Sequence, residues 1–448
     1  MKTLYQQIDI FNDVPAQSYK QNRINQLSAR SGTFTDNIKL PVHRWFKYSA
    51  GFSAEWAEQL ILKHTTSSPI IVLDPFAGSG TTLLSADKAG AISYGYESHP
   101  FVYHIASAKL LWHLDEYEFM ELANTVLETA KELSVKLKPP ENIPPLLLKC
   151  YTSDSLLGLF SLRDAFNNIV TLQQSQGRSA YYDLVWLTIT AILRPCSHVG
   201  TAQWQYILPN KRKANTLDPF EAYKAKIYEI SSDMIFAKHA GFVKSATMYP
   251  HDAREQGLLK KASVDLVLTS PPYPNNYDYA DATRLEMTFW GEINSWGDLQ
   301  HAVRRFIIRS SSQHSAAERL QLDQLLADQF VSPIVSELSE VCNDLAEIRL
   351  TKGGKKTYHT MVAAYFCDLA KVFLALRPIC KTGSTVCFVI GDSAPYGVYV
   401  PAEDWLGRLA VSAGFKSFSF EKLRDRNIKW KNRKHRVPLH EGRLWIEG

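Results

Sequence analysis

The chain has 448 residues, enough for one large core or for two or three domains. Hydrophobic residues make up 45% and charged residues 21% of the chain, values that exclude a disordered or low-complexity protein. The formal net charge is only +5, so any nucleic-acid surface must be a local patch.

The cysteines and the first residues indicate a cytoplasmic protein. Six cysteines are scattered without a CxxC pair, which argues against a disulfide framework and a zinc ribbon, and we expect no metal site. Acidic residues stand where a signal peptide would be apolar. The longest nearly apolar stretch, 184–193, is shorter than the roughly 18 to 20 residues that cross a bilayer, so we predict a buried helix and no membrane partner.

The first predicted elements form a β-α-β unit. A helix is expected after Ser53, a candidate N-cap, and residues 70–74 predict a compact β-branched strand. A glycine-rich turn leads from this strand into a helix over 81–90. Residues 91–98 predict a second strand, ending in Glu97 about twenty positions beyond the turn, the spacing of a nucleoside-binding crossover.

The rest of the chain returns to strand character twice. Residues 102–240 are mainly helical and too long for a crossover, with a polar, basic interruption near their end, so an inserted subdomain is expected. Residues 245–255 and 264–273 predict strands, and 275–360 predict helices and loops. An amphipathic helix and a buried strand follow over 365–393, and the C-terminal segment is expected to form an antiparallel edge.

The glycine-rich turn is a candidate ligand loop. It reads Asp74-Pro75-Phe76-Ala77-Gly78-Ser79-Gly80-Thr81-Thr82 and lies where backbone N–H groups and a helix N-terminus favour an anion, such as the carboxylate of a methionine moiety. Leu83 takes the third glycine position of the dinucleotide fingerprint, which disfavours a nicotinamide cofactor. Glu97 is the candidate for ribose hydroxyls and Asp252 for an adenine amino group. The alternatives are a turn without ligand and two plain surface carboxylates.

The second candidate loop, Thr269-Ser270-Pro271-Pro272-Tyr273, follows an apolar strand. This loop suits a reaction at an exocyclic amine of cytosine or adenine. Such an amine is a poor nucleophile, because its lone pair is delocalised into the ring. The Ser270 hydroxyl and the Pro271 carbonyl can accept the two amino hydrogens, Pro272 helps to fix the loop, and Tyr273 offers a face for a flipped base. Methyl transfer then needs positioning and charge stabilisation, with no covalent intermediate. The alternative is a simple Pro-rich turn.

Together the two loops resemble those of the bacterial DNA amino-methyltransferases of restriction-modification systems, which combine DPFAGSGTT with a Pro-Pro-Tyr loop. TSPPY resembles the cytosine-N4 branch. The resemblance implies S-adenosyl-L-methionine as cofactor, double-stranded DNA with one flipped base as substrate, and a cognate restriction endonuclease as partner. It also implies a Rossmann-like methyltransferase sheet, an α/β fold, to which the helical patterns described above add two mainly helical insertions. The cofactor-binding residues expected on these grounds are Phe52, Ser53, Asp74, Phe76, Gly78, Gly80, Thr81, Glu97 and Asp252.

The order of the segments differs from the arrangements familiar in this family. The candidate cofactor loop, 74–82, precedes the candidate catalytic loop, 269–273. Only a short turn separates Asp252 from the strand before the catalytic loop, where a recognition domain would be expected. We therefore expect five segments: 1–101, the aromatic loop and cofactor half of the core; 102–240, a helical insertion; 241–290, the catalytic strand and loop; 291–360, a second helical insertion; and 361–448, the C-terminal part of the sheet. Either insertion could read DNA.

Basic and aromatic side chains that occur together are candidates for DNA contact, because they suit phosphates and stacked bases. Solvated charged faces are the alternative. The candidates are Trp204, Tyr206, Lys211, Arg212 and Lys213, then Arg304, Arg305 and Arg309, and finally Lys431, Arg433 and Lys434 in a dense C-terminal run.

Other functions remain open at this stage. Pro195-Cys196 resembles the nucleophile of cytosine-C5 methyltransferases, but it lies in the helical insertion, so a packed core thiol is expected. The predicted function is therefore cytosine-N4 methylation of DNA. The alternatives are N6-adenine methylation of DNA, an RNA N-methyltransferase and a catalytically silent DNA-binding protein.

Overall fold

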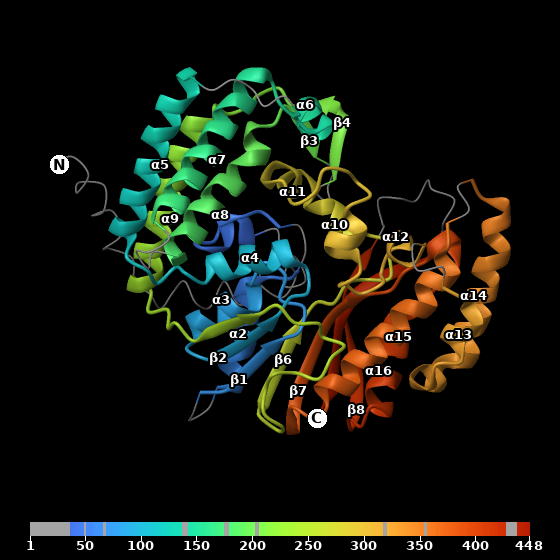
Figure 1. The fold of residues 1–448 in the computed structure, drawn as a ribbon. Helices are drawn as coiled ribbons and strands as arrows, with labels where there is room; N and C mark the ends of the chain where they lie inside the picture. The colour runs from blue at the N-terminus through green and yellow to red at the C-terminus, as the bar shows by residue number, and fades with distance from the viewer. Residues whose placement is uncertain are drawn as a thin grey trace.

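A seven-stranded sheet forms the centre of the protein in the computed structural model (Figure 1). The structure describes residues 36–48, 51–65, 69–136, 142–173, 179–201, 206–316, 320–353, 356–426 and 437–448. The strands of the sheet are β1 (Ile71–Asp74), β2 (Ile92–Tyr96), β5 (Ala246–Tyr249), β6 (Val264–Thr269), β7 (Cys380–Gly391), β8 (Ser417–Arg426) and β9 (Leu439–Glu447). Their order, β5-β2-β1-β6-β7-β9-β8, places β1 and β6 side by side at the centre.

The sheet is parallel except at one edge. Strands β5, β2, β1, β6 and β7 pair in parallel, whereas β9 pairs antiparallel with both β7 and β8. This confirms the predicted Rossmann-like α/β sheet and its antiparallel C-terminal edge. Because the chain continues from β1 to β2 on one side and returns to β6 on the other, a topological switch point lies at the carboxyl ends of β1 and β6.

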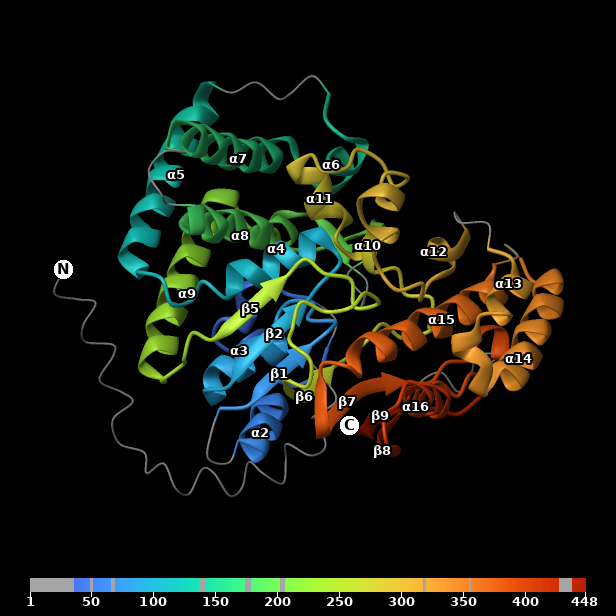
Figure 2. The same ribbon diagram turned by 60° about the horizontal axis from the view of Figure 1, so that its bottom comes forward.

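Both faces of the sheet are covered by helices, as its apolar strands require. Side chains alternate along a strand, so Val72 packs against α2 while its neighbour Leu73 belongs to the core on the opposite face. The helices are α2 (Ala54–His64), α3 (Thr81–Ala89), α4 (Pro100–Lys109), α5 (Glu116–Lys136), α6 (Pro145–Cys150), α7 (Ser153–Gln173), α8 (Ser179–Cys196), α9 (Pro219–His239), α10 (Tyr279–Ala282), α11 (Arg284–Trp290), α12 (Ser312–Ala316), α13 (Leu322–Leu326), α14 (Val335–Ile348), α15 (Tyr358–Leu376) and α16 (Ala402–Ser412). Figure 2 shows α2 and α3 on one side of the strands and α15 and α16 on the other.

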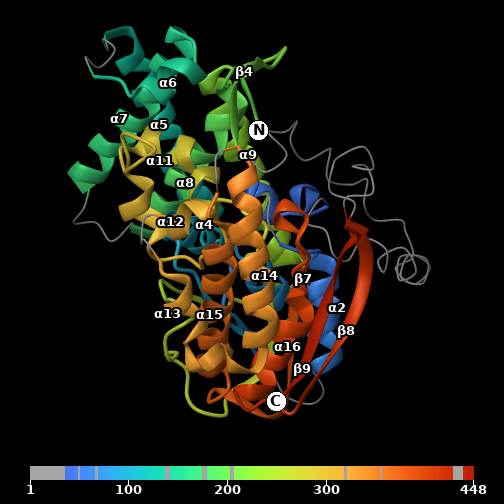
Figure 3. The same ribbon diagram turned by 90° about the vertical axis from the view of Figure 1, so that its right-hand side faces the viewer.

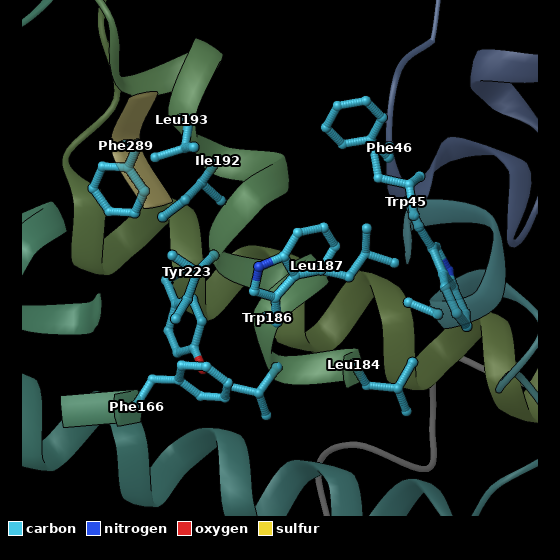
Figure 4. Close-up of a cluster of buried hydrophobic side chains, with 14 of the residues drawn as sticks. Trp45, Phe46, Phe166, Leu184, Trp186, Leu187, Ile192, Leu193, Tyr223 and Phe289 are labelled. Carbon is cyan, nitrogen blue, oxygen red and sulfur yellow. The ribbon is translucent and has the colours of Figure 1, made fainter. Parts of the chain in front are cut away.

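The first insertion packs as a helical layer on the sheet domain. Its long helices α5, α7, α8 and α9 share one hydrophobic core with α3 and with the loop before α2. Figure 4 shows this core, in which Trp45 and Phe46 lie near Leu184 and Leu187 of α8. The insertion and the sheet domain are therefore joined by apolar contact, and the segment boundaries given above stay predictions.

The insertion also contains a two-stranded hairpin that the sequence does not reveal. We expected only a basic interruption there, but β3 (Val199–Thr201) and β4 (Ile207–Arg212) pair antiparallel. Lys211 and Arg212 break the apolar pattern that would predict a strand, and β4 is stabilised by its pairing with β3.

By its length and composition alone, helix α15 could cross a membrane. This property was not predicted from the sequence. Of the most apolar window of α15, 83% is buried inside the protein, between the sheet and α14 and α16. Figure 3 looks onto this layer of C-terminal helices. Its hydrophobicity is therefore explained by the core. The apolar stretch 184–193 lies in α8 and is buried, as predicted.

Candidate active site

The two sequence loops meet at the switch point between β1 and β6. Asp74 is the last residue of β1 and Thr269 the last residue of β6, and both are buried. The Thr269 hydroxyl donates to one oxygen of Asp74 at 2.5 Å, and the Thr82 hydroxyl donates to the other at 2.6 Å. One carboxylate thus joins the end of β1, the start of α3 and the end of β6.

The glycine loop bends into α3 through two left-handed residues. Gly78 has a φ of 52° and Gly80 a φ of 87°, a region that side chains with a Cβ rarely adopt. The N–H of Phe76 donates to Asp74 at 3.0 Å, and α3 begins at Thr81. The backbone geometry is that of a β-α turn with a free helix N-terminus, which suits an anionic group.

Glu97 lies beside this turn after β2. Its two oxygens accept the N–H of Gly78 at 2.9 Å and that of His99 at 2.8 Å. Burial raises the pKa of Glu97 to about 7, although these two backbone bonds oppose the shift. Burial likewise raises the pKa of Asp74 to about 6. The structure therefore brings two perturbed carboxyl groups to the cofactor loop, a feature of functional sites.

The segment before α2 also reaches this region. Phe52 is buried, and the Ser53 hydroxyl accepts the N–H of Trp56 at 3.3 Å, which confirms Ser53 as the N-cap. Asn37 joins the start of this segment to the start of α2. Its amide nitrogen donates to the Phe52 carbonyl at 2.9 Å, and its amide oxygen accepts the N–H of Ala54 at 3.0 Å. No local pattern in the sequence marks this asparagine.

A recess opens between this segment and the start of α3. The residues that line it are Asn37, Ile38, His43, Phe46, Tyr48, Ser79, Thr81 and Lys109. Lys109 of α4 is buried and donates to the carbonyls of His43 at 3.0 Å and Phe46 at 3.3 Å. Burial lowers its pKa to about 7. Neither Lys109 nor Tyr48 was predicted to line this recess. The aromatic run that contains Tyr48 was the one feature of the sequence that could have indicated it.

The catalytic loop lies beside the end of β7. The Ser270 hydroxyl donates to the Val389 carbonyl at 3.1 Å, which leaves its oxygen lone pairs as acceptors. Pro271 is buried, and Pro272 and Tyr273 are half-buried. The Tyr273 carbonyl accepts the N–H of Asn275 at 2.7 Å, so the loop turns sharply after the tyrosine.

A buried carboxylate fixes the segment after the catalytic loop. Asp278 accepts from Arg304 at 2.7 Å and lies 3.1 Å from the ring of His314, and these groups hold its pKa at about 2 against the effect of burial. Its own N–H donates to the Tyr206 hydroxyl at 2.6 Å. The ring of Tyr206 lies 5.3 Å from that of Tyr277. The β3–β4 hairpin is therefore attached directly to the catalytic segment.

Asp252 follows β5, as predicted, but its carboxylate is already engaged. It accepts from the Arg254 guanidinium at 2.6 Å and from the Arg254 N–H at 2.9 Å. Arg254 also pairs with Asp368 at 3.3 Å. A role for Asp252 at an adenine amino group stays a prediction, and it would require the carboxylate to serve both partners.

The candidate DNA residues fall into different surroundings. Lys211 and Arg212 are exposed, whereas Lys213 donates to the Arg194 carbonyl at 2.6 Å. Arg304 is buried against Asp278, so the expectation of phosphate contact is wrong for it. Arg309 pairs with Asp368 at 2.6 Å, and its contact with phosphate stays a prediction. Trp204, Lys431, Arg433 and Lys434 lie outside the described residues.

All six cysteines are buried, and none lies in the catalytic loop. Burial raises the pKa of Cys196 to about 12, which confirms the predicted core thiol. Burial raises the pKa of the other thiols as well. A thiolate nucleophile of the cytosine-C5 type is therefore not part of this site.

Comparison with known proteins agrees with this site. Residues 4–108, which include the cofactor loop and Glu97, match the N6/N4 family described as DNA methylase. Over these residues the chain is similar to the DNA amino-methyltransferases. No solved structure gives a significant match.

The similarity to two type II methyltransferases extends over most of the chain. Type II methyltransferase M.BsoBI of Geobacillus stearothermophilus is 24% identical over 88% of this chain and 82% of its own length. Type II methyltransferase M.AvaI of Nostoc sp. is 24% identical over 92% of this chain and 87% of its own length. Type II methyltransferase M.HindIII of Haemophilus influenzae is 46% identical, but over only 52 residues, 12% of this chain and 17% of its own length.

Proposed function

We propose that the protein transfers a methyl group from S-adenosyl-L-methionine to the exocyclic N4 of cytosine in double-stranded DNA, at a specific site. The observation that carries the proposal is the bond between Asp74 and Thr269, which places the cofactor loop and the catalytic loop at one switch point. The relatives that are named type II methyltransferases support a place in restriction-modification. We propose a cognate endonuclease as partner and a cytoplasmic location.

The residues at the cofactor loop fit S-adenosyl-L-methionine. The start of α3 offers backbone N–H groups to its carboxylate, and the Glu97 carboxylate can accept ribose hydroxyls. Phe52 and Ser53 would cover the methionine end of the cofactor. Asp74 holds the loop in place through the Phe76 N–H and the hydroxyls of Thr82 and Thr269. When bound, the cofactor supplies an electrophilic methyl group.

The catalytic loop fits an amino nitrogen as the acceptor. The Ser270 oxygen and the Pro271 carbonyl would accept the two amino hydrogens, and Pro272 would hold that geometry by restricting the backbone. Tyr273 would pack on the face of the flipped base. The burial of every thiol supports attack by nitrogen over a cysteine-dependent attack by ring carbon.

Nucleoside analysis tests both the reaction and the base. We expect purified protein, incubated with S-adenosyl-L-methionine and mixed-sequence duplex DNA, to produce N4-methylcytosine, measured by mass spectrometry of the digested DNA. N6-methyladenine alone would overturn the choice of base. Methylation of RNA and not of duplex DNA, or of neither, would overturn the choice of substrate.

A cysteine variant serves as the control for mechanism. Cys196→Ala is expected to methylate DNA as the wild type does, because this thiol is buried in the helical insertion. Loss of methylation with retained folding and cofactor binding would support a thiol-dependent reaction instead.

A further inference from the structure

We infer that Arg426, on the edge strand β8, is a positioning residue that fixes the ring of Tyr273 in the catalytic loop. The contact stands on geometry alone, whereas its effect on methyl transfer rests on the proposed function. Arg426 comes from the far edge of the sheet, because β7 and β9 lie between β8 and the catalytic strand β6.

The guanidinium of Arg426 lies over the tyrosine ring. Its central carbon is 5.4 Å from the centroid of Tyr273, within the range of a cation–π contact. One of its nitrogens, Nη1, donates to the Asp392 carbonyl at 2.7 Å. Arg426 is thus held from one side by the end of β7 while it contacts the catalytic loop on the other.

The lack of a side chain at Gly391 favours the observed position of the guanidinium. A Cβ at Gly391 would lie 2.5 Å from Nη1 of Arg426 and 3.2 Å from Cε2 of Tyr273. The backbone of Gly391 is not in the left-handed region, so its conformation alone does not require glycine. The glycine therefore serves the close approach of the arginine and the tyrosine.

A network behind Asp392 holds the anchor of Arg426. The Asp392 carboxylate is buried, accepts the N–H of His440 at 2.9 Å and lies 2.9 Å from Nδ1 of its ring. The other ring nitrogen lies 2.9 Å from Glu403 of α16. These three residues also form a group of metal-ligand types. One ring nitrogen of His440 is hydrogen-bonded to Glu403, and the other makes a close contact with the Asp392 carboxylate.

The consequence for catalysis is orientation of the ring. An aromatic face can support a flipped base only if it keeps one orientation, and the guanidinium restricts Tyr273 from the side of β7. Arg426 does not itself reach the reacting atoms in this role; it acts through the tyrosine.

Steady-state kinetics on three variants test this role. Arg426→Gln is expected to lower kcat about tenfold, with little change in KM for DNA or cofactor, because it removes a cation–π interaction of ordinary strength. Arg426→Lys is expected to recover part of kcat, because a cation is restored. Arg424→Gln is the matched control: it removes the same charge two residues earlier, where Arg424 pairs with Glu441 at 2.8 Å, whereas the cation–π contact with Tyr273 comes from Arg426.

Two kinetic results would overturn the inference. An equal effect of Arg426→Gln and Arg424→Gln would mean that only charge matters. A raised KM for DNA with unchanged kcat in Arg426→Gln would assign the arginine to phosphate contact instead.

A spectroscopic measurement tests the contact without any activity. In protein labelled with 3-fluorotyrosine, the ¹⁹F resonance of residue 273 is assigned by its loss in Tyr273→Phe. Arg426→Gln should shift this resonance and Arg424→Gln should not; an unmoved resonance in Arg426→Gln would overturn the inference. If the wild-type protein transferred no methyl group, the proposed function would fail, while this measurement would still decide the contact.

Discussion

The hydroxyl of Thr269 donates a 2.5 Å hydrogen bond to the carboxylate of Asp74, across the junction of β1 and β6. The two residues are far apart in the sequence and end adjacent parallel strands. Through this bond the loop proposed to bind the cofactor and the loop proposed to orient the amine share one anchor. The relative placement of donor and acceptor groups in such a site controls the rate of transfer.

Replacing Asp74 tests this anchor. We expect Asp74→Ala to abolish methyl transfer and to weaken cofactor binding by roughly 10- to 100-fold, since charge-assisted hydrogen bonds to the loop are removed. The fold should persist, because the Thr82 hydroxyl also donates to the Leu268 carbonyl at 3.1 Å. Calorimetric titration with S-adenosyl-L-methionine and circular dichroism measure the two properties. Near-normal transfer would contradict the assigned site.

The raised pKa of Glu97 predicts a pH dependence of cofactor affinity. With a pKa of about 7, this carboxyl passes from roughly one-tenth ionised at pH 6 to roughly nine-tenths at pH 8, so affinity should rise about tenfold over this interval. Binding titrations at several pH values measure the effect. Glu97→Gln should bind more weakly and show a flat profile, and an unchanged pH dependence in that variant would exclude Glu97 as its source.

The same group affects stability with the opposite sign. Burial favours the protonated carboxyl in the folded state, so the stability that it contributes is fully present below the ordinary pKa of 4.5. This contribution is lost as the pH rises through about 7. Glu97→Gln removes the titration, and urea unfolding of the two proteins at pH 5 and pH 8 should show a smaller loss of stability in the variant.

Two substitutions separate the contribution of the Tyr273 ring to methyl transfer from that of its hydroxyl. Tyr273→Ala should lower kcat by about 10- to 100-fold or more, because base stacking on an aromatic ring is removed. Cofactor affinity should stay unchanged, since the cofactor loop belongs to another strand. Tyr273→Phe keeps the ring and should retain most activity. A larger loss in the phenylalanine variant than expected from stacking would assign the reaction to the hydroxyl.

Asp233 of α9 connects the helical insertion to the segment before α2. It is buried and accepts from the Val42 N–H, the Arg44 guanidinium and the Trp45 indole N–H. Asp233→Ala should lower the free energy of unfolding by about 3 to 5 kcal/mol, because it leaves these donors without their carboxylate. It should also weaken cofactor binding, since the aromatic segment borders the recess.

An exposed ion pair provides the control for Asp233. Glu128 pairs with Lys131 on the outer face of α5, and Glu128→Ala should change stability by less than about 1 kcal/mol. Chemical denaturation measures both variants. Similar losses in the two would show that Asp233 does not anchor the segment.

The two exposed basic residues of β4 are expected to make a salt-dependent contribution to DNA binding. Lys211→Gln with Arg212→Gln should weaken binding to duplex DNA and reduce the slope of log affinity against log salt by about two, one for each phosphate that is no longer neutralised. Fluorescence anisotropy over a range of salt concentrations measures the slope. The control pair, Lys260→Gln with Lys261→Gln, removes two exposed charges at the amino end of β6, away from the catalytic loop. Equal slopes in the two double variants would mean that β4 has no special role.

Much of the site was predictable because local patterns encode it. A β-branched strand, a glycine turn and a helix must form a β-α unit, and Pro-Pro after an apolar strand must form a stiff loop. By contrast, the β3–β4 hairpin escaped prediction because its stability comes from pairing over distance, against a polar local sequence. Arg304 was misassigned because a buried arginine and a solvent-exposed one look alike in sequence.

Local patterns in the sequence predicted the parts of the candidate site: the glycine turn after β1, the Ser-Pro-Pro-Tyr loop after β6 and the spacing to Glu97. The distant side chains that support these parts could be found only in the packed fold. Lys109 and Arg426 contact the candidate site from α4 and β8, and Asp233 of α9 holds the segment that borders it; no local pattern marks these residues. The physical reason is that a hydrogen bond or ring contact between distant segments depends on how the sheet and its helices pack, whereas a turn or a cap depends on a few neighbouring residues.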